Sequence, residues 1–196
     1  MRAAVRVGWR ILGGFLAGLA LWLALSRPYE RVLAAGAEFL IRAFESPATT
    51  RLEARPGEFV VTRSDWPPAS TSPGLPADDL HFNFVLLVAL FAAGNKIWRS
   101  GRVAAFGVAC GILFLVHLTA LVFEVHAVYA TRLGAWSQTH YGPVARNFWA
   151  AGYHFYVIAG RFAAPFAIWW PLRGEGSEGE TRGAGWRRRR NARKNR

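Results

Sequence analysis

Cysteine is nearly absent from the chain, which has Cys110 as its one thiol among 196 residues. A single cysteine cannot form an internal disulfide, and it excludes zinc and iron–sulfur sites built from several cysteines. Gly-rich phosphate loops, HExxH and Gly-x-Ser-x-Gly are also missing from the sequence. The sequence therefore predicts neither a cofactor nor a metal.

Acidic residues are scarce: 12 Asp and Glu stand against 24 Lys and Arg, a formal net charge of +12. The excess is confined to 2–10, 96–102 and 173–196, which carry +3, +3 and +6. Each of these segments flanks an apolar block, as the cytoplasmic segments of a bacterial inner-membrane protein do. The pattern favours a membrane protein with both termini in the cytoplasm. The tail is expected to contact anionic lipid headgroups, and no nucleic acid is expected as a partner.

Apolar residues form 53% of the chain and gather in four blocks. Since about twenty helical residues cross a bilayer, we expect transmembrane helices at 8–26, 80–98, 103–123 and 147–171. The second block is the weakest because its apolar core is short and Asn83 lies inside it. The first block has the flanks of a cleavable signal peptide, but its length favours an uncleaved anchor.

The polar segment between the first two blocks is expected to lie outside the membrane. Residues 29–46 have the apolar spacing of an amphipathic helix lying on the membrane surface, which Pro47 would end. Residues 50–65 alternate around Pro56-Gly57 and predict a β-hairpin, and 66–79 predict a loop.

The expected fold is therefore an all-α integral membrane protein with four transmembrane helices and a small external helix-plus-hairpin element. Its parts are the cytoplasmic N-terminus and first helix (1–26), the external segment (27–79), the second to fourth helices (80–172) and a disordered basic cytoplasmic tail (173–196).

Two of the predicted helices carry polar residues at a spacing of seven. These are Asn147, His154 and Arg161 on the last helix, and Cys110, His117 and Glu124 on the third. Seven residues make nearly two helical turns, so each set lies close to one face. A central arginine costs about 2.5–3.5 kcal/mol in a bilayer, so we expect the two polar faces to meet protein, either each other or a partner.

Arg161 has no carboxylate near it on this predicted helical hairpin, because Glu124 lies at the outer end. A buried cation needs a counter-charge, which favours an acid supplied by another membrane protein. Pro165 follows Arg161 by four residues and would free the Arg161 carbonyl from helical hydrogen bonding. The predicted partner-binding or intramembrane polar surface contains Asn147, His154, Arg161, His117 and Glu124. The predicted helix-packing positions are Gly14, Gly18, Gly152 and Pro165; the first two form a small-residue face.

Other interpretations stay open: structural contacts between helices, a cysteine enzyme, and a small proton-coupled transporter or channel that uses paired histidines. For the enzyme, Cys110 would lie about 10 Å from His117 along a straight helix, too far for direct activation. A metal site of Glu124, His126 and His140 is disfavoured, because Glu-x-His is not a recognised helical ligand pair.

Three segments resemble the exosortase H-associated membrane proteins, small accessory proteins found with a bacterial C-terminal-signal sorting system. They are HFNFVLLVALFAA (81–93), VHLTALVFEV (116–125) and AAGYHFYVIAGRFAAPFAIWW (150–170). The similar features are an Asn at the entry to the second span, a Phe-Glu pair ending the third, and Ala-Pro before a terminal Trp in the last.

The resemblance implies an accessory role beside an exosortase, in envelope protein sorting, with no reaction of its own. The expected partner is thus another integral membrane protein, with a homo-oligomer as a further arrangement. A degenerate exosortase-like transpeptidase is the enzyme alternative. It fits less well because the cysteine of exosortases lies in an Ala-Cys-Ser-Gly-like motif, whereas Ala109-Cys110-Gly111 stands here.

Overall fold

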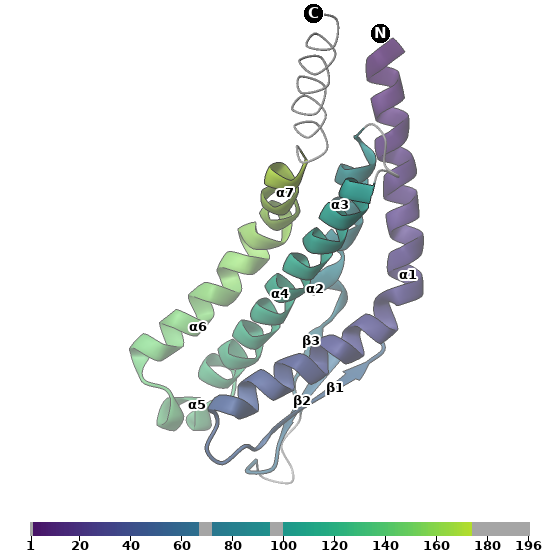
Figure 1. Ribbon diagram of the computed structural model, residues 1–196. Helices are drawn as coiled ribbons and strands as arrows, with labels where there is room; N and C mark the ends of the chain where they lie inside the picture. The colour runs from purple at the N-terminus through teal and green to yellow at the C-terminus, as the bar shows by residue number, and fades with distance from the viewer. Residues whose placement is uncertain (1, 67–71, 95–99, 174–196) are drawn as a thin grey trace, which may run out of the picture.

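The first helix of the computed structural model, which describes residues 2–66, 72–94 and 100–173, is far longer than the sequence predicts. Helix α1 runs from Arg2 to Phe44 with Pro28 inside it. The expected membrane helix 8–26 and the expected surface helix 29–46 are therefore two halves of one helix, and the break predicted between them is wrong. Figure 1 shows a bend between these halves, and proline is the usual cause of such a bend.

A small antiparallel sheet follows α1, with strands β1 (Thr50–Arg55), β2 (Glu58–Arg63) and β3 (Gly74–Pro76) in the order β1-β2-β3. The hairpin predicted for this region is present as β1 and β2. Its turn contains Gly57 at φ 76°, a left-handed conformation that favours glycine. Strand β3 falls in the segment 66–79 that was expected to be a loop, because three residues that include Gly and Pro give no strand signal.

The rest of the chain is helical. The helices are α2 (Asp78–His81), α3 (Asn83–Ala92), α4 (Ser100–Thr131), α5 (Ala135–His140), α6 (Pro143–Phe155), the π-helix η1 (Tyr156–Gly160) and α7 (Arg161–Leu172). The third predicted span is thus part of a helix that continues to Thr131.

Two helices in the described part of the chain are long and apolar enough to cross a membrane, within Val7–Phe44 and Gly101–Thr131. The protein is mostly helical with a small sheet, but four membrane-spanning helices are not found by this criterion. Helix α3 has only ten residues, and η1 interrupts the helical run from α6 to α7. The expected disorder of the basic tail concerns 174–196, which lie outside the described residues.

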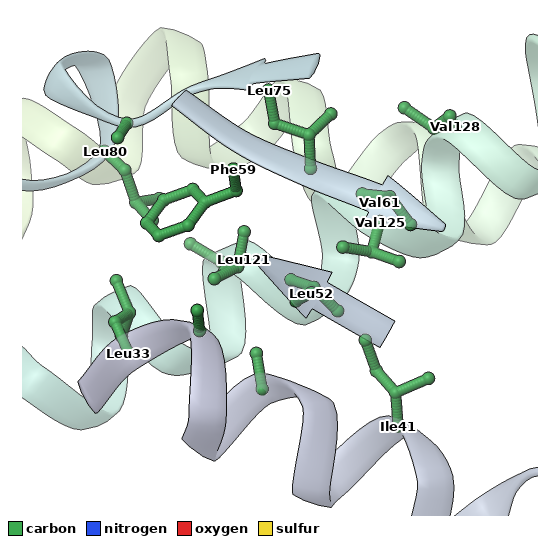
Figure 2. Close-up of a cluster of buried hydrophobic side chains, with 14 of the residues drawn as sticks. Leu33, Ile41, Leu52, Phe59, Val61, Leu75, Leu80, Leu121, Val125 and Val128 are labelled. Atoms are coloured by element: carbon green, nitrogen blue, oxygen red, sulfur yellow. The ribbon is translucent and has the colours of Figure 1, made fainter. Parts of the chain in front are cut away.

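A hydrophobic core lies where the sheet meets the second half of α1 and the second half of α4 (Figure 2). Its largest buried side chains come from all three parts: Leu33 and Ile41 of α1, Phe59, Val61 and Leu75 of the sheet, and Leu121 and Tyr129 of α4. Fully burying such a side chain is worth about 1.5–3 kcal/mol, so this core holds the sheet against the two long helices.

A second core lies between α3, the first half of α4, and α7. It contains Leu87, Phe91, Ala105, Ala109, Leu113 and Ile168. The outer surface around it is apolar, with exposed Leu12, Leu16, Val108, Ile112 and Phe166. Since soluble proteins rarely expose so many large apolar side chains together, this half of the molecule is the part suited to a bilayer.

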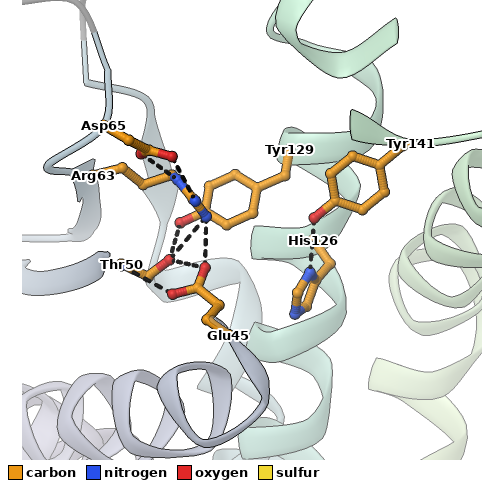
Figure 3. Close-up of polar contacts among 7 residues, drawn as sticks. All are labelled: Glu45, Thr50, Arg63, Asp65, His126, Tyr129 and Tyr141. Atoms are coloured by element: carbon orange, nitrogen blue, oxygen red, sulfur yellow. Dashed lines mark hydrogen bonds and ion pairs between the residues drawn. The ribbon is translucent and has the colours of Figure 1, made fainter. Parts of the chain in front are cut away.

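Polar contacts tie the end of α1 to the sheet and to α4 (Figure 3). Glu45 accepts hydrogen bonds from Arg63 at 2.5 Å and from the Thr50 N–H at 3.0 Å, and the Thr50 hydroxyl lies 2.8 Å from the Tyr129 hydroxyl. Arg63 also donates to Asp65 through two nitrogens, and these bonds lower the pKa of the Asp65 carboxyl.

Strand β1 is an edge strand, and two of its backbone N–H groups donate to carboxylates of α1 and of the residue that follows it. Glu38 accepts from the Leu52 N–H at 2.9 Å, and Glu45 accepts from the Thr50 N–H. These bonds satisfy donors that no neighbouring strand pairs.

Candidate functional site

The candidate site is a polar network buried between the helices and centred on His117. The imidazole of His117 is fully buried. Its Nδ1 lies 2.5 Å from the Tyr29 hydroxyl, and its Nε2 lies 2.7 Å from the Asn83 amide oxygen. The Asn83 amide nitrogen donates to the Arg161 carbonyl at 3.0 Å and to the Tyr156 hydroxyl at 3.4 Å.

The donor and acceptor of each hydrogen bond in this network can be assigned by starting from Tyr156. The Tyr156 hydroxyl donates to the Leu80 carbonyl at 2.5 Å, so it accepts from Asn83. Because Asn83 donates through nitrogen, its oxygen must accept from His117 Nε2–H. In the neutral imidazole the other ring nitrogen then accepts from Tyr29 O–H. Neutral His117 thus joins α1 to α3, and Asn83 extends the chain of bonds to η1 and α7.

Pro165 explains why the Arg161 carbonyl is available to Asn83. Proline has no N–H to donate to the residue four positions earlier. The expected release of this carbonyl is confirmed by its hydrogen bond from Asn83. The π-helix η1 ends one residue before Arg161, so the irregular backbone and the side-chain amide that satisfies it lie together.

The π-helix also separates the polar residues that the sequence places on one face. A π turn takes up one extra residue, which turns the following side chains by about 100° relative to a regular α-helix. The Arg161 side chain consequently points toward Asp79, whereas Asn147 and His154 are exposed on the outside of α6. The two predicted polar faces therefore do not meet at His117 and His154, since His117 is buried and His154 is exposed.

Arg161 has a carboxylate partner within this chain. Its guanidinium lies 3.3 Å from Asp79 and 4.9 Å from the centre of the Phe162 ring. An acid from another membrane protein, which the sequence favours, is therefore not needed to pair Arg161. The sequence hides the pair because the two residues are 82 positions apart.

Glu124 is buried at 9% exposure, but it does not belong to the hydrogen bonds of His117. It lines a cavity of about 50 Å³ together with Asp79, Tyr153, Tyr156 and Arg161. The carboxylate and the guanidinium that the sequence placed far apart thus border the same small space.

Sequence reasoning missed a second buried polar cluster next to the first. Trp22 Nε1–H donates to His81 Nδ1 at 2.8 Å, and His81 Nε2 lies 3.3 Å from Glu30. Glu30 and His81 are each 2% exposed. The one signal available was Glu30, an acid directly after Tyr29 on an otherwise apolar helical stripe.

Glu30, Asp78 and His81 offer ligand atoms within 4.8 Å of one another, which raises the question of a metal. Trp22 donates to His81 Nδ1, so in a neutral ring the proton is on Nε2. This Nε2–H points toward Glu30. A metal would need a lone pair at that position. The geometry therefore favours a hydrogen-bonded cluster.

The cysteine and the histidines described above are engaged in packing or hydrogen bonds and are not arranged as a nucleophile with its base. Cys110 is half-buried, and both ring nitrogens of His117 are engaged by Tyr29 and Asn83. His126 stacks on Trp149 and His140 on Trp136, with ring centres 4.2 Å apart in each pair. These contacts suit helix packing.

The small residues named for helix packing lie at close helix contacts. A Cβ on Gly14 would lie 2.3 Å from the Ala92 Cβ, and one on Gly18 would lie 3.1 Å from the Val85 carbonyl oxygen. A Cβ on Gly152 would lie 2.1 Å from the Phe123 ring. Because residues 14 and 18 meet the late and early parts of α3, respectively, α1 and α3 are antiparallel.

The model of a family described as exosortase H-associated membrane protein matches residues 1–174. Neither the curated proteins nor the solved structures gave a significant match. The matched range includes both buried clusters and every helix and strand described above. The chain therefore belongs to the exosortase H-associated membrane protein family.

Proposed function

We propose that this protein is a non-catalytic accessory subunit of a bacterial inner-membrane protein-sorting complex, with an exosortase as its partner. The proposal rests on the observation that the buried polar groups form hydrogen bonds with one another. His117, Asn83, Tyr29 and the Arg161 carbonyl bind one another, which suits a scaffold better than a reaction centre. The family description supports the choice of partner.

The rival functions have less support. A thiol enzyme needs a base within hydrogen-bond reach of Cys110, and His117 has both nitrogens engaged. A proton relay between His117 and His154 lacks a path, since one is buried and the other is exposed on α6.

Four membrane crossings with both termini in the cytoplasm are part of the proposal. The run from Pro143 to Leu172 contains 30 helical residues, about 45 Å, which exceeds the roughly 30 Å hydrocarbon core. Helix α3 packs antiparallel on the apolar half of α1 and so shares its depth. The start of α1 and the end of α7 lie at the same end of the molecule (Figure 1), which supports termini on one side.

Topology reporters test this arrangement. We expect fusions after Gly101 and after Arg196 to report the cytoplasm, and a fusion after Pro56 in the hairpin turn to report the outside, because the basic segments stay inside. Cytoplasmic signal from the Pro56 fusion would contradict the proposed external position of 27–79.

The proposed partner surface is the outward face of α6, which we call the α6 face. It contains Val144, Asn147, Phe148, Ala151, His154 and Phe155, all exposed. Phe155 is 70% exposed and Val144 84% exposed. Aromatic groups beside polar ones are typical of contact surfaces, so the exposed Asn147 and His154 remain candidates for binding, whereas His117 supports the surface from within.

Co-purification with the exosortase of the same genome tests the partner proposal. Replacing Asn147, His154 and Phe155 together with alanine should reduce the recovered exosortase by about tenfold or more, the loss that truncating interface anchors produces. Val103 and Val108, also exposed but on α4, provide the matched alanine control. Cys110→Ser should change nothing; loss of sorting activity at unchanged protein level in that variant would favour the enzyme instead.

A further inference from the structure

An amphipathic groove of about 400 Å³ lies between α1, the α2–α3 segment and α7. Asp78, Asp79 and Arg161 line one part of it, and Phe15, Leu86 and Phe162 line the apolar part. The volume lies in the range of about 300–1,000 Å³ that is usual for small-molecule sites.

The polar and apolar parts of the groove lie at opposite ends along α3. Because α1 and α3 are antiparallel, with Gly14 against Ala92, Phe15 lies beside the far end of α3 from Asp78 and Asp79. The charged end is thus next to α2, and the apolar walls extend along α3. Phe162 is 58% exposed, so the apolar part opens sideways from the helices.

The charges at the polar end include more acids than cations. Asp79 is paired with Arg161 but is 75% exposed, so its carboxylate has room for another donor. Asp78 is also exposed, and it lies beside the buried Glu30. The end therefore offers carboxylates for a cation and one guanidinium for an anion.

We propose that this groove binds a phospholipid with a phosphoethanolamine headgroup. The ammonium donates to Asp78 and Asp79, the phosphate accepts from Arg161, and an acyl chain lies along Phe15 and Leu86. An anionic headgroup without an amine would place its charge among carboxylates. A phosphocholine headgroup has no N–H to donate. Lipids with either of these headgroups should therefore bind more weakly than one with phosphoethanolamine. The site does not depend on the identity of a protein partner.

Native mass spectrometry of the full chain in detergent tests the proposal, with phosphatidylethanolamine, phosphatidylglycerol and phosphatidylcholine of identical acyl chains. The other two lipids lack the ammonium N–H donors and their charge-assisted hydrogen bonds, so we expect at least about tenfold preference for phosphatidylethanolamine. Asp78→Asn with Asp79→Asn should remove that preference. Glu53→Gln, an exposed acid on β1, should leave it unchanged.

A second variant separates loss of binding from loss of fold. Leu86→Trp fills the apolar part and should weaken all three lipids at unchanged thermal stability. Equal affinity of the unsubstituted protein for the three lipids would overturn the proposal, as would preference kept in the double Asp variant. Loss of the co-purified exosortase in Leu86→Trp with lipid selectivity intact would assign the groove to the partner protein and also overturn it.

Discussion

Replacing Asn83 with leucine should lower the free energy of unfolding by about 3 kcal/mol or more. Asn83 satisfies the buried His117 Nε2–H and the Arg161 carbonyl, and leucine can bind neither. Each buried polar group left without a partner costs about 1–3 kcal/mol. Leucine has the branched shape of asparagine and is somewhat larger, so the substitution leaves no cavity to account for the loss.

The matched control is Asn147→Leu, which changes the same residue type at an exposed position on α6. Its effect should stay within about 0.5 kcal/mol. Unfolding of each variant in mixed micelles, followed by tryptophan fluorescence, measures the difference. Similar losses in both variants would show that the buried network contributes little.

Gly14→Leu should separate the first half of α1 from α3 and sharply reduce the yield of folded protein. Even the Cβ would lie 2.3 Å from the Ala92 Cβ and 3.1 Å from the Ala89 Cα. Neither atom belongs to a flexible side chain, so the helices must move apart. Overpacking of this kind costs about 1–3 kcal/mol and occasionally more.

Gly13→Leu is the control for this prediction, because a Cβ on Gly13 meets no heavy atom within 4 Å. The neighbouring position should accept leucine with near-normal yield in size-exclusion chromatography. A milder test is the double variant Gly14→Ala with Ala92→Gly. The second substitution removes the carbon that clashes with the added Cβ, so it should restore part of the stability lost in Gly14→Ala. Equal yields of the Gly13 and Gly14 variants would contradict the close helix contact.

The sequence predicts the features that depend on local pattern. Apolar runs located the long helices, Pro56-Gly57 located the hairpin, and Pro165 gave the free carbonyl at Arg161. Each of these needs only a short window of residues, so tertiary context does not change it.

The features that the sequence could not give depend on distant contacts or on register. The π-helix before Arg161 has no sequence signal here, yet it turns every later side chain to a new face. The pairs Trp22–His81 and Arg161–Asp79 join residues 59 and 82 positions apart. The two predicted helices 8–26 and 29–46 join into α1 with Pro28 inside it, and the second half is held by packing on the sheet and α4.

The two carboxylates that bind the N–H groups of the edge strand β1 affect how this molecule can associate. With Glu38 and Glu45 bound to the Leu52 and Thr50 N–H groups, an incoming polypeptide would have to displace charged acceptors before extending the sheet. Aggregation by strand addition is thereby hindered at this edge. Association at this edge is therefore left to side chains, whose specificity depends on shape and charge rather than on main-chain pairing.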